Sequence, residues 1–539
     1  MKALTLAGLI LCSLALTTAW VLARDAQLTY TPATPRGEPG WQVVRIVYHS
    51  QAELERLTAR LDVWEVHPVD HIIVARVNTA ENDRLTSEGY TVTAQPIPPR
   101  VSLSSAYDCY RTVSQLVADQ DALAATYPTL TQIITLGASY EGRPLRVLKL
   151  TNTAHPVQDR PRFFLMANIH GREFITPETA MQFARRLLEG YGHDPDLTWL
   201  LDGREVHILA SANPDGHAHN EGTFTYWRKN ANPANQSVCY PTGWGDGYGT
   251  DLNRNSDFEW GGSGSSDTVC DPTYRGTLPA SDVETQAIQH YVTSLFPDQR
   301  GSLITDAAPM TTTGILISLH SYNNQVMWPW GHTYGAAPNA AQLEALGTRF
   351  ASYNGYTPQP DSALYLASGT TDDWSYGELG IASYTFEMGG SADGFLPTCD
   401  RTTALIQPNL DALVYAARVA RAPYQLADGP DTTWITLDVL TATVKVQAII
   451  TGSQIISSAE AYVDTPPWAG GIPIPLAASD GAFDHSTEIV SDTLSISQAG
   501  RHILFVRGQD ISGHWGAVAY AAFDGPWAHS FYLPLVMRH

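Results

Sequence analysis

Two histidines and a glutamate are spaced as ligands of a divalent metal ion. His170 and Glu173 follow the apolar segment 162–169 and precede a segment with a helical pattern. Three residues apart at a strand-to-helix turn, both side chains can converge on one ion. His320 ends a second apolar segment, 314–320, and two histidines with one carboxylate leave a fourth position open for water. We therefore expect a catalytic metal site, with a satisfied core histidine as the alternative interpretation of His320.

Buried strands that alternate with helices are expected to position these residues. Between residues 105 and 422, apolar segments such as 162–168 and 315–320 alternate with helical patterns such as 177–190. This order is typical of an α/β fold in which a mixed, mostly parallel sheet carries helices on both faces. Because both histidines end buried strands, we expect them to meet at one edge of that sheet.

Two further regions flank this segment. Residues 24–100 alternate strand-like and helical patterns and predict a small α/β module, which ends in the proline-rich segment 96–100. Residues 430–539 contain short Val, Ile and Thr-rich runs separated by turn residues. They predict an Ig-like β-sandwich accessory domain. A surface, a polymer or another protein is an equally good partner for that domain.

Composition and the N-terminal segment indicate an exported protein. The 539 residues include 32 Lys and Arg against 54 Asp and Glu, a formal net charge of −22, which argues against a nucleic-acid partner. Residues 1–23 begin with a positive charge and contain an apolar run that is shorter than the roughly 20 residues needed to span a bilayer. We expect a cleaved signal peptide, no membrane span and a secreted monomer.

The cysteines agree with export. The four that follow the predicted signal peptide are Cys109, Cys239, Cys270 and Cys399. An even number in an exported protein is consistent with two disulfides, for which three pairings are possible. No two of them form a CxxC motif, so a cysteine metal site is not expected.

An ordered series of motifs resembles the zinc carboxypeptidases of the pancreatic and bacterial type. The match covers residues 105 to 420 and consists of HGRE at 170, NPDG at 213, YWRKN at 226, DLNRN at 251, HSY at 320, LYLASGTTDDW at 364 and YTFEM at 384. The resemblance implies one Zn²⁺ per chain, bound by His170, Glu173 and His320, and hydrolysis of the C-terminal peptide bond of peptide and protein substrates. Cobalt or manganese would also suit this ligand set.

The same resemblance implies the catalytic roles. Glu387 corresponds to the general base that takes a proton from the attacking water and delivers it to the leaving amine. Arg228 corresponds to the arginine that stabilises the oxyanion, whereas the adjacent Lys229 is expected to be solvated. Asp251 matches a carboxylate that fixes the tautomer of a zinc-binding histidine.

Further residues resemble groups that bind the substrate. Asn253 and Arg254 match the clamp for the terminal carboxylate, which a guanidinium can bind through two hydrogen bonds. Tyr365 matches a mobile tyrosine that closes over the substrate. Arg172 matches a contact further from the cleaved bond, with a surface arginine as the alternative.

Asp372 matches the floor of the pocket for the C-terminal side chain. A buried carboxylate would leave an apolar ligand facing an unpaired charge, whereas a basic side chain would satisfy it. Gly331 would leave the opposite wall open for a long side chain. We therefore predict a preference for C-terminal Arg and Lys. The alternative is that Asp372 or Asp373 caps the following helix.

The resemblance also bears on the remaining regions. It implies a disulfide between Cys239 and Cys270, which leaves Cys109 and Cys399 to pair. By analogy, residues 24–100 are a propeptide that covers the cleft, with an adhesion module as the alternative.

Two rival functions follow from the same motifs. One is a peptidase of this family that acts on cell-wall peptides or internal bonds, or that has a broad or hydrophobic C-terminal preference. The other is a catalytically inactive binding protein. The carboxylate clamp argues against the first, and the complete set of ligands and catalytic residues against the second.

Overall fold

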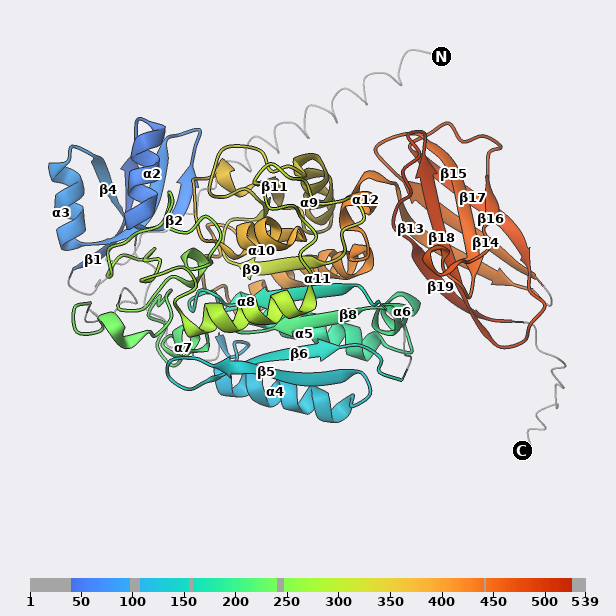
Figure 1. Cartoon of the computed structure of the whole chain (residues 1–539), viewed down its shortest axis with the longest axis horizontal. Coiled ribbons are helices and arrows are strands. Elements are labelled where there is room, and N and C mark those ends of the chain that lie inside the picture. The colour runs from blue at the N-terminus through green and yellow to red at the C-terminus, as the bar shows by residue number, and fades with distance from the viewer. Residues whose placement is uncertain (1–39, 97–106, 155–158, 240–246, 441–442, 526–539) are drawn as a thin grey trace, which may run out of the picture.

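The computed structural model describes residues 40–96, 107–154, 159–239, 247–440 and 443–525 and arranges them around three sheets (Figure 1). The predicted signal peptide and the last residues of the chain lie outside this described part. Within it, the helices are all too short or too polar to cross a bilayer.

An eight-stranded mixed sheet forms the centre of the molecule. Its strand order is β11-β10-β12-β9-β7-β8-β6-β5. The strands are β5 (Thr131–Ala138), β6 (Pro144–Leu150), β7 (Arg162–Ala167), β8 (Glu205–Leu209), β9 (Ile315–His320), β10 (Gln325–Trp328), β11 (Thr357–Pro360) and β12 (Ala382–Glu387). The run from β12 through β9 and β7 to β8 is parallel, whereas β6, β5 and the β10–β12 pair are antiparallel. The predicted mixed, mostly parallel sheet is confirmed.

Helices cover both faces of this sheet because its central strands bury side chains on both sides. On β7, Phe163 packs against α5, whereas its neighbour Phe164 packs against α8. On β12, Tyr384 faces α9 and Thr385 faces α10, as the alternation of side chains along a strand requires. The helices of this region are α4 (Val113–Thr126), α5 (Ile175–Gly190), α6 (Pro195–Gly203), α7 (Pro214–Ala218), α8 (Val283–Leu295), α9 (Ala340–Asn354), α10 (Thr371–Leu379), α11 (Cys399–Val419) and α12 (Pro423–Asp428).

The N-terminal module is a separate four-stranded antiparallel sheet with two helices. Its strand order is β2-β3-β1-β4. Leu54, Leu57 and Leu85 of the helices pack on the strands and form a core of its own. Its elements are β1 (Trp41–Val47), α2 (Gln51–Arg60), β2 (Asp62–His67), β3 (Ile72–Asn78), α3 (Thr79–Ser87) and β4 (Thr91–Gln95). The predicted small α/β module is thus present.

The C-terminal region, predicted as an Ig-like β-sandwich, is an all-β domain with the form of a nearly closed antiparallel sheet. Its seven strands form one antiparallel sheet of order β13-β14-β17-β16-β15-β18-β19, and β13 also contacts β19, so the sheet curls until it nearly closes. The strands are β13 (Asp431–Val439), β14 (Thr443–Thr451), β15 (Ile456–Val463), β16 (Ile474–Ala478), β17 (Thr487–Ser495), β18 (Arg501–Asp510) and β19 (Ala519–Asp524).

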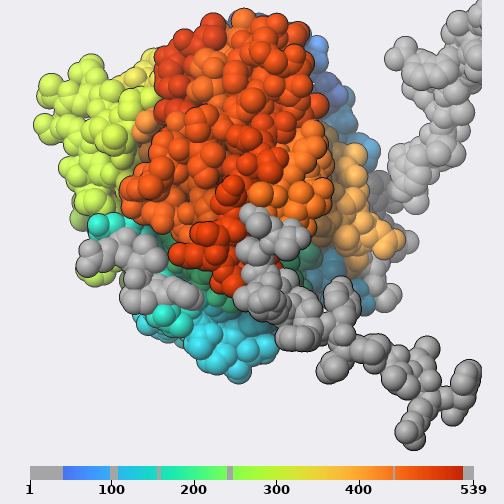
Figure 2. All heavy atoms as spheres, turned by 90° about the vertical axis from the view of Figure 1, so that its right-hand side faces the viewer, coloured from blue at the N-terminus to red at the C-terminus, as the bar shows by residue number. Residues whose placement is uncertain are grey.

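Aromatic and charged contacts fix this β domain to the central region. Trp199 of α6 stacks on Tyr520 of β19 with ring centroids 4.0 Å apart, and Arg349 of α9 pairs with Asp431 of β13. The β domain and the N-terminal module lie at opposite ends of the molecule (Figure 1). Seen from its own end, the β domain occupies the middle of the molecular face (Figure 2). The domain boundaries predicted at 100, 105, 422 and 430 stay predictions.

Candidate metal centre and active site

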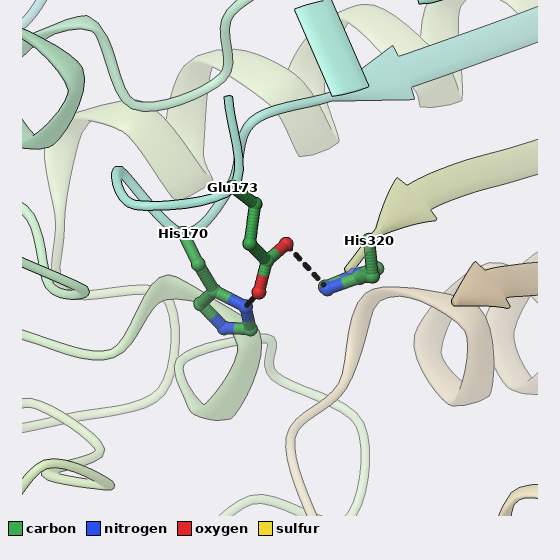
Figure 3. A group of neighbouring side chains, drawn as sticks. All are labelled: His170, Glu173 and His320. Carbon is green, nitrogen blue, oxygen red and sulfur yellow. Dashed lines mark hydrogen bonds and ion pairs between the residues drawn. The ribbon is translucent and has the colours of Figure 1, made fainter. Parts of the chain in front are cut away.

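One edge of the central sheet brings the three predicted metal ligands together (Figure 3). His320 is the last residue of β9, and His170 and Glu173 lie in the connection between β7 and α5. All three residues are buried, and one potential ligand atom from each lies within 4.8 Å of the other two. Parallel neighbours β7 and β9 therefore place their carboxyl ends side by side, as the strand pattern predicted.

Glu173 lies between the two imidazole rings (Figure 3). Its Oε1 atom is 2.8 Å from Nδ1 of His170 and its Oε2 atom is 3.3 Å from Nδ1 of His320. That Oε2 atom is buried and accepts no well-formed hydrogen bond from the described residues. Burial alone would raise the pKa of Glu173, but the two histidines lower it. Two imidazole nitrogens facing an ionised, incompletely satisfied carboxylate fit Zn²⁺.

Asp251 and Arg228 contact the imidazole ring of His170 and orient it. Asp251 is fully buried, and its Oδ1 atom is 3.2 Å from Nε2 of His170. Arg228 donates to Oδ2 of Asp251 through Nη2 at 2.8 Å and Nε at 3.1 Å, and its Nη1 lies 3.3 Å from Nδ1 of His170. A carboxylate on Nε2 holds the proton there and leaves Nδ1 free to bind metal. On the second ligand, Oγ of Ser318 lies 3.0 Å from Nε2 of His320.

Glu387 reaches the same edge from the neighbouring strand. It is the last residue of β12 and stands opposite His320 in the parallel register. Its Oε2 atom is buried and receives no hydrogen bond from the described residues. Burial raises the pKa of Glu387 to about 7, which a nearby bound cation would oppose. A carboxyl group with a pKa near neutrality suits proton transfer at neutral pH.

The other predicted substrate-binding residues line one cavity with the metal ligands. These residues are Arg172, Asn253, Arg254, Tyr365 and Asp372, and Arg228 and Glu387 line the same cavity. Arg172 is buried, so the alternative of a surface arginine is wrong. Asp251 lies behind the cavity wall rather than on it, as expected of a residue that acts through His170.

Backbone contacts fix the side chain of Arg254 in the cavity. It donates from Nε to the carbonyl of Gly264 at 2.7 Å and from Nη1 to the carbonyl of Asn253 at 2.7 Å. Gly264 has a φ of +72°, and a Cβ atom there would lie 1.7 Å from the carbonyl oxygen of Leu366. Only glycine fits so close an approach of two backbone segments.

A disulfide and a buried lysine hold the loop that carries Asn253 and Arg254. Cys239 is bonded to Cys270, the pair that the family resemblance implied, and Cys109 is bonded to Cys399. The expectation that Lys229 is solvated is wrong. It is buried, and its Nζ donates to the carbonyls that flank Cys270, those of Val269 at 3.4 Å and Asp271 at 3.1 Å. Burial lowers the pKa of Lys229 to about 7.

Strand β2 of the N-terminal module forms part of the wall of the cavity. Val63, Trp64, Glu65 and Val66 line it beside the metal ligands. The neighbouring Asp62 accepts a hydrogen bond from Nη1 of Arg172 at 2.8 Å. The substrate-binding side of the cavity is therefore in contact with the chain's own N-terminal segment.

Among the cavity residues that sequence reasoning missed are Tyr322, Asp361 and Phe395. Tyr322 stands in the HSY motif, so its position beside a ligand could have indicated it. Its hydroxyl donates to Oε1 of Glu65 at 3.1 Å, and Phe395 packs against Trp64 with ring centroids 5.4 Å apart. Asp361 and Phe395 reach the cavity from connections that carry no periodic signal.

The buried ligand set at the edge of an α/β sheet defines a mononuclear zinc site of the hydrolase type. A family model described as zinc carboxypeptidase matches residues 116–410. The carboxypeptidase A1 of Rattus norvegicus is 32% identical over 323 residues, covering 57% of this chain and 71% of the relative. A zinc carboxypeptidase of Saccharothrix mutabilis subsp. capreolus is 31% identical over 303 residues, with coverages of 54% and 65%.

Solved structures share the fold. The carboxypeptidase A of Helicoverpa armigera has a TM-score of 0.57 at 23% identity and covers 71% of this chain and 98% of its own. Thrombin activatable fibrinolysis inhibitor has a TM-score of 0.56 at 23% identity, with coverages of 71% and 99%. The chain therefore belongs to the zinc carboxypeptidase family. It is a zinc-dependent metallocarboxypeptidase that acts on peptides.

Removal of zinc should lower the thermal stability of the full chain. An ion that binds only the folded state stabilises it by about 4 kcal/mol when free ion is a thousandfold above its Kd. We expect chelation to lower the unfolding midpoint and added zinc to restore it, as measured by scanning fluorimetry with zinc analysis. Glu173→Gln should lose this response, and Glu378→Gln, on the exposed side of α10, should keep it. Equal midpoints with and without zinc would contradict the ligand assignment.

Proposed function

We propose that this carboxypeptidase removes single C-terminal residues with a preference for Arg and Lys. The observation that carries the proposal is Asp372, which is buried and lines the cavity near the metal ligands. Thr385 donates a hydrogen bond to its Oδ2 at 3.2 Å. Among the described residues, no Lys or Arg forms an ion pair with Asp372. A basic substrate side chain would supply the missing positive charge.

The neighbouring Asp373 has a structural role that separates it from Asp372. Its carboxylate accepts hydrogen bonds from the backbone N–H groups of Gly331 and His332, both at 2.9 Å, and lies 2.7 Å from Nδ1 of His332. The cap of α10 is Thr370, whose hydroxyl accepts from the N–H of Asp373. Because Thr370 already occupies the N-cap position, this arrangement supports a role for Asp372 other than the helix cap.

The geometry supports the following roles in catalysis. Bound at His170, Glu173 and His320, zinc would supply a Lewis acid that polarises the scissile carbonyl and acidifies water. Glu387 accepts the proton of the attacking water and passes it to the leaving amine. Arg228, already held by Asp251, donates a hydrogen bond to the oxyanion.

The terminal carboxylate of the substrate binds to Asn253 and Arg254. The fixed guanidinium of Arg254 provides two parallel N–H donors for a carboxylate. Tyr365 lines the same cavity and closes over the substrate through its hydroxyl. This clamp confines the cleavage to the last peptide bond and disfavours the cell-wall and internal-bond alternatives.

The N-terminal module acts as an inhibitory propeptide in this proposal. Its strand β2 lines the cavity, and Trp64 stacks on Tyr226 with ring centroids 5.4 Å apart. A module that occupies the substrate side must leave before a peptide can enter. Cutting after Arg100 would make its docking intermolecular and allow it to dissociate. The two disulfides and the predicted signal peptide support a secreted enzyme.

The test is the release of C-terminal residues from blocked dipeptides that end in Arg, Lys, Phe or Leu. We expect the zinc-loaded chain, cut after Arg100, to release Arg and Lys fastest. Asp372→Asn should lower kcat/KM for both by about tenfold to a hundredfold, because a hydrogen bond to a charged group is lost. Glu378→Gln removes a carboxylate from the same helix outside the cavity. It should leave kcat/KM unchanged for the dipeptides that end in Arg and in Lys.

Other outcomes separate the alternatives. Fastest release of Phe or Leu would keep the carboxypeptidase and discard the basic pocket. Absence of release from every dipeptide would favour an enzyme for cell-wall peptides or an inactive binding protein.

A further inference from the structure

A second carboxylate, Asp361, lies in the proposed side-chain pocket. It begins the short helix η4 (Asp361–Ala363) and lines the same cavity as Asp372 and Glu387. Its Oδ2 atom is buried and receives no hydrogen bond from an N–H or O–H donor of the described residues. Among the described residues, no Lys or Arg forms an ion pair with Asp361. Asp361 and Asp372 thus both line the cavity without an ion-pair partner among the described residues.

The glycine at position 331 makes room for this arrangement. A Cβ atom at Gly331 would lie 3.3 Å from Cβ of Asp361 and 3.7 Å from Oδ2 of Asp373. Asp373 is satisfied by His332 and two backbone N–H groups, so it does not compete for a ligand in the pocket. Asp361 and Asp372 are left as the two acceptors that face the space for a substrate side chain.

We propose that Asp361 and Asp372 together form a receptor for a guanidinium group, so that the enzyme favours C-terminal Arg over C-terminal Lys. The proposal rests on the preference for basic residues proposed above and adds a second specificity residue to it. A guanidinium is planar and carries five N–H donors, so it can bind two carboxylates at once. An ammonium group is a compact, strongly hydrated charge and gains less from a second fixed acceptor.

The paired carboxylates also imply a proton released on binding. The pKa of Asp361 is raised well above its ordinary value, mainly because the group is buried and secondly because Asp372 lies nearby. Asp373 and Glu387 are the other acids that act on it, and His332 is engaged by Asp373. Two adjacent carboxyl groups in a buried site share one proton because both cannot ionise together. Entry of a guanidinium replaces that proton, which passes to the buffer.

The first arm of the test uses the unaltered chain, loaded with zinc and cut after Arg100. N-acetyl-arginine and N-acetyl-lysine are titrated calorimetrically in two buffers of different ionisation enthalpy. We expect tighter binding of the arginine compound and release of close to one proton. Equal affinities, or binding without proton release, would overturn the proposal without any variant.

The second arm compares kcat/KM for dipeptides that end in Arg and in Lys. Asp361→Asn should lower the Arg-to-Lys ratio by about tenfold, the loss of one hydrogen bond to a charged group, and should remove the proton release. Glu378→Gln should leave both unchanged, and zinc content shows that each variant is loaded. An unchanged ratio in Asp361→Asn would overturn this proposal alone, whereas failure of the unaltered enzyme to release either residue would overturn the proposed function.

Discussion

Glu387→Gln should lower kcat by about 10²- to 10⁴-fold, the usual contribution of a positioned general base, without loss of zinc. The amide has the size of the carboxyl group but cannot accept the proton of water. Glu387 ends β12 beside His320 and keeps a buried Oε2 atom without a hydrogen bond from the described residues. The substitution therefore removes chemistry from the cavity and disrupts no observed contact.

The measurement is kcat on a dipeptide with a C-terminal Arg, together with zinc per chain by mass spectrometry. Glu378→Gln makes the same chemical change on the exposed side of α10 and should retain the activity of the unaltered enzyme. A kcat within tenfold of the unaltered enzyme would show that another group transfers the proton. Loss of zinc from Glu387→Gln would instead place Glu387 among the metal ligands.

Asp62→Asn should raise the activity of the uncut chain by about 10²-fold or more. Asp62 is buried and pairs with Arg172 at 2.8 Å and with Arg76 at 3.1 Å. Breaking a buried ion pair by removing one partner costs about 3 to 5 kcal/mol. The share that comes from Arg172 is borne by the docked module alone, because Arg76 belongs to β3 of the module and stays beside Asp62 in either state. The module should therefore leave the cavity more often, which frees Arg172 for substrate.

The pKa of Asp62 sets the pH range of this contact. Burial alone would raise the pKa, but Arg172 and Arg76 lower it from 3.8 to about 2. A carboxyl group with a lowered pKa contributes its full stabilisation above its undocked pKa, and this contribution is lost as the pH falls through the docked value. Acidification to about pH 5 should therefore leave the Asp62 contact intact and should not activate the uncut chain through it.

The experiment compares kcat/KM of uncut and cut chains for each variant. Asp70→Asn, on an exposed turn of the same module, should leave the uncut chain as inactive as the unaltered one. Cut Asp62→Asn protein should match cut unaltered protein, which shows that the catalytic region is intact. Equal activity of the uncut and cut unaltered chains would disprove inhibition by the module.

The sequence by itself determined the metal ligands and the class of fold. His170 and Glu173 are close in the chain, so a local turn suffices to bring them together, and His320 ends a strand whose apolar character places it in the sheet. Alternation of apolar strands and helices predicts helices on both faces, because each buried strand needs cover on both sides. The seven motifs depend on residue type and order, which are properties of the chain alone.

Only the tertiary structure decided between the alternatives that the sequence left open for several charged groups. Asp372 and Asp373 are adjacent in sequence, and the packing of α10 against Gly331 and His332 assigns one to the pocket and the other to the wall. Contacts between segments that are distant in the sequence bring Asp361 to the cavity. Such contacts also bury Lys229 under the disulfide loop. Side-chain direction in irregular segments depends on such packing rather than on local spacing, so no periodicity reports it. The docking of Asp62 against Arg172 likewise required two separate folded regions to meet.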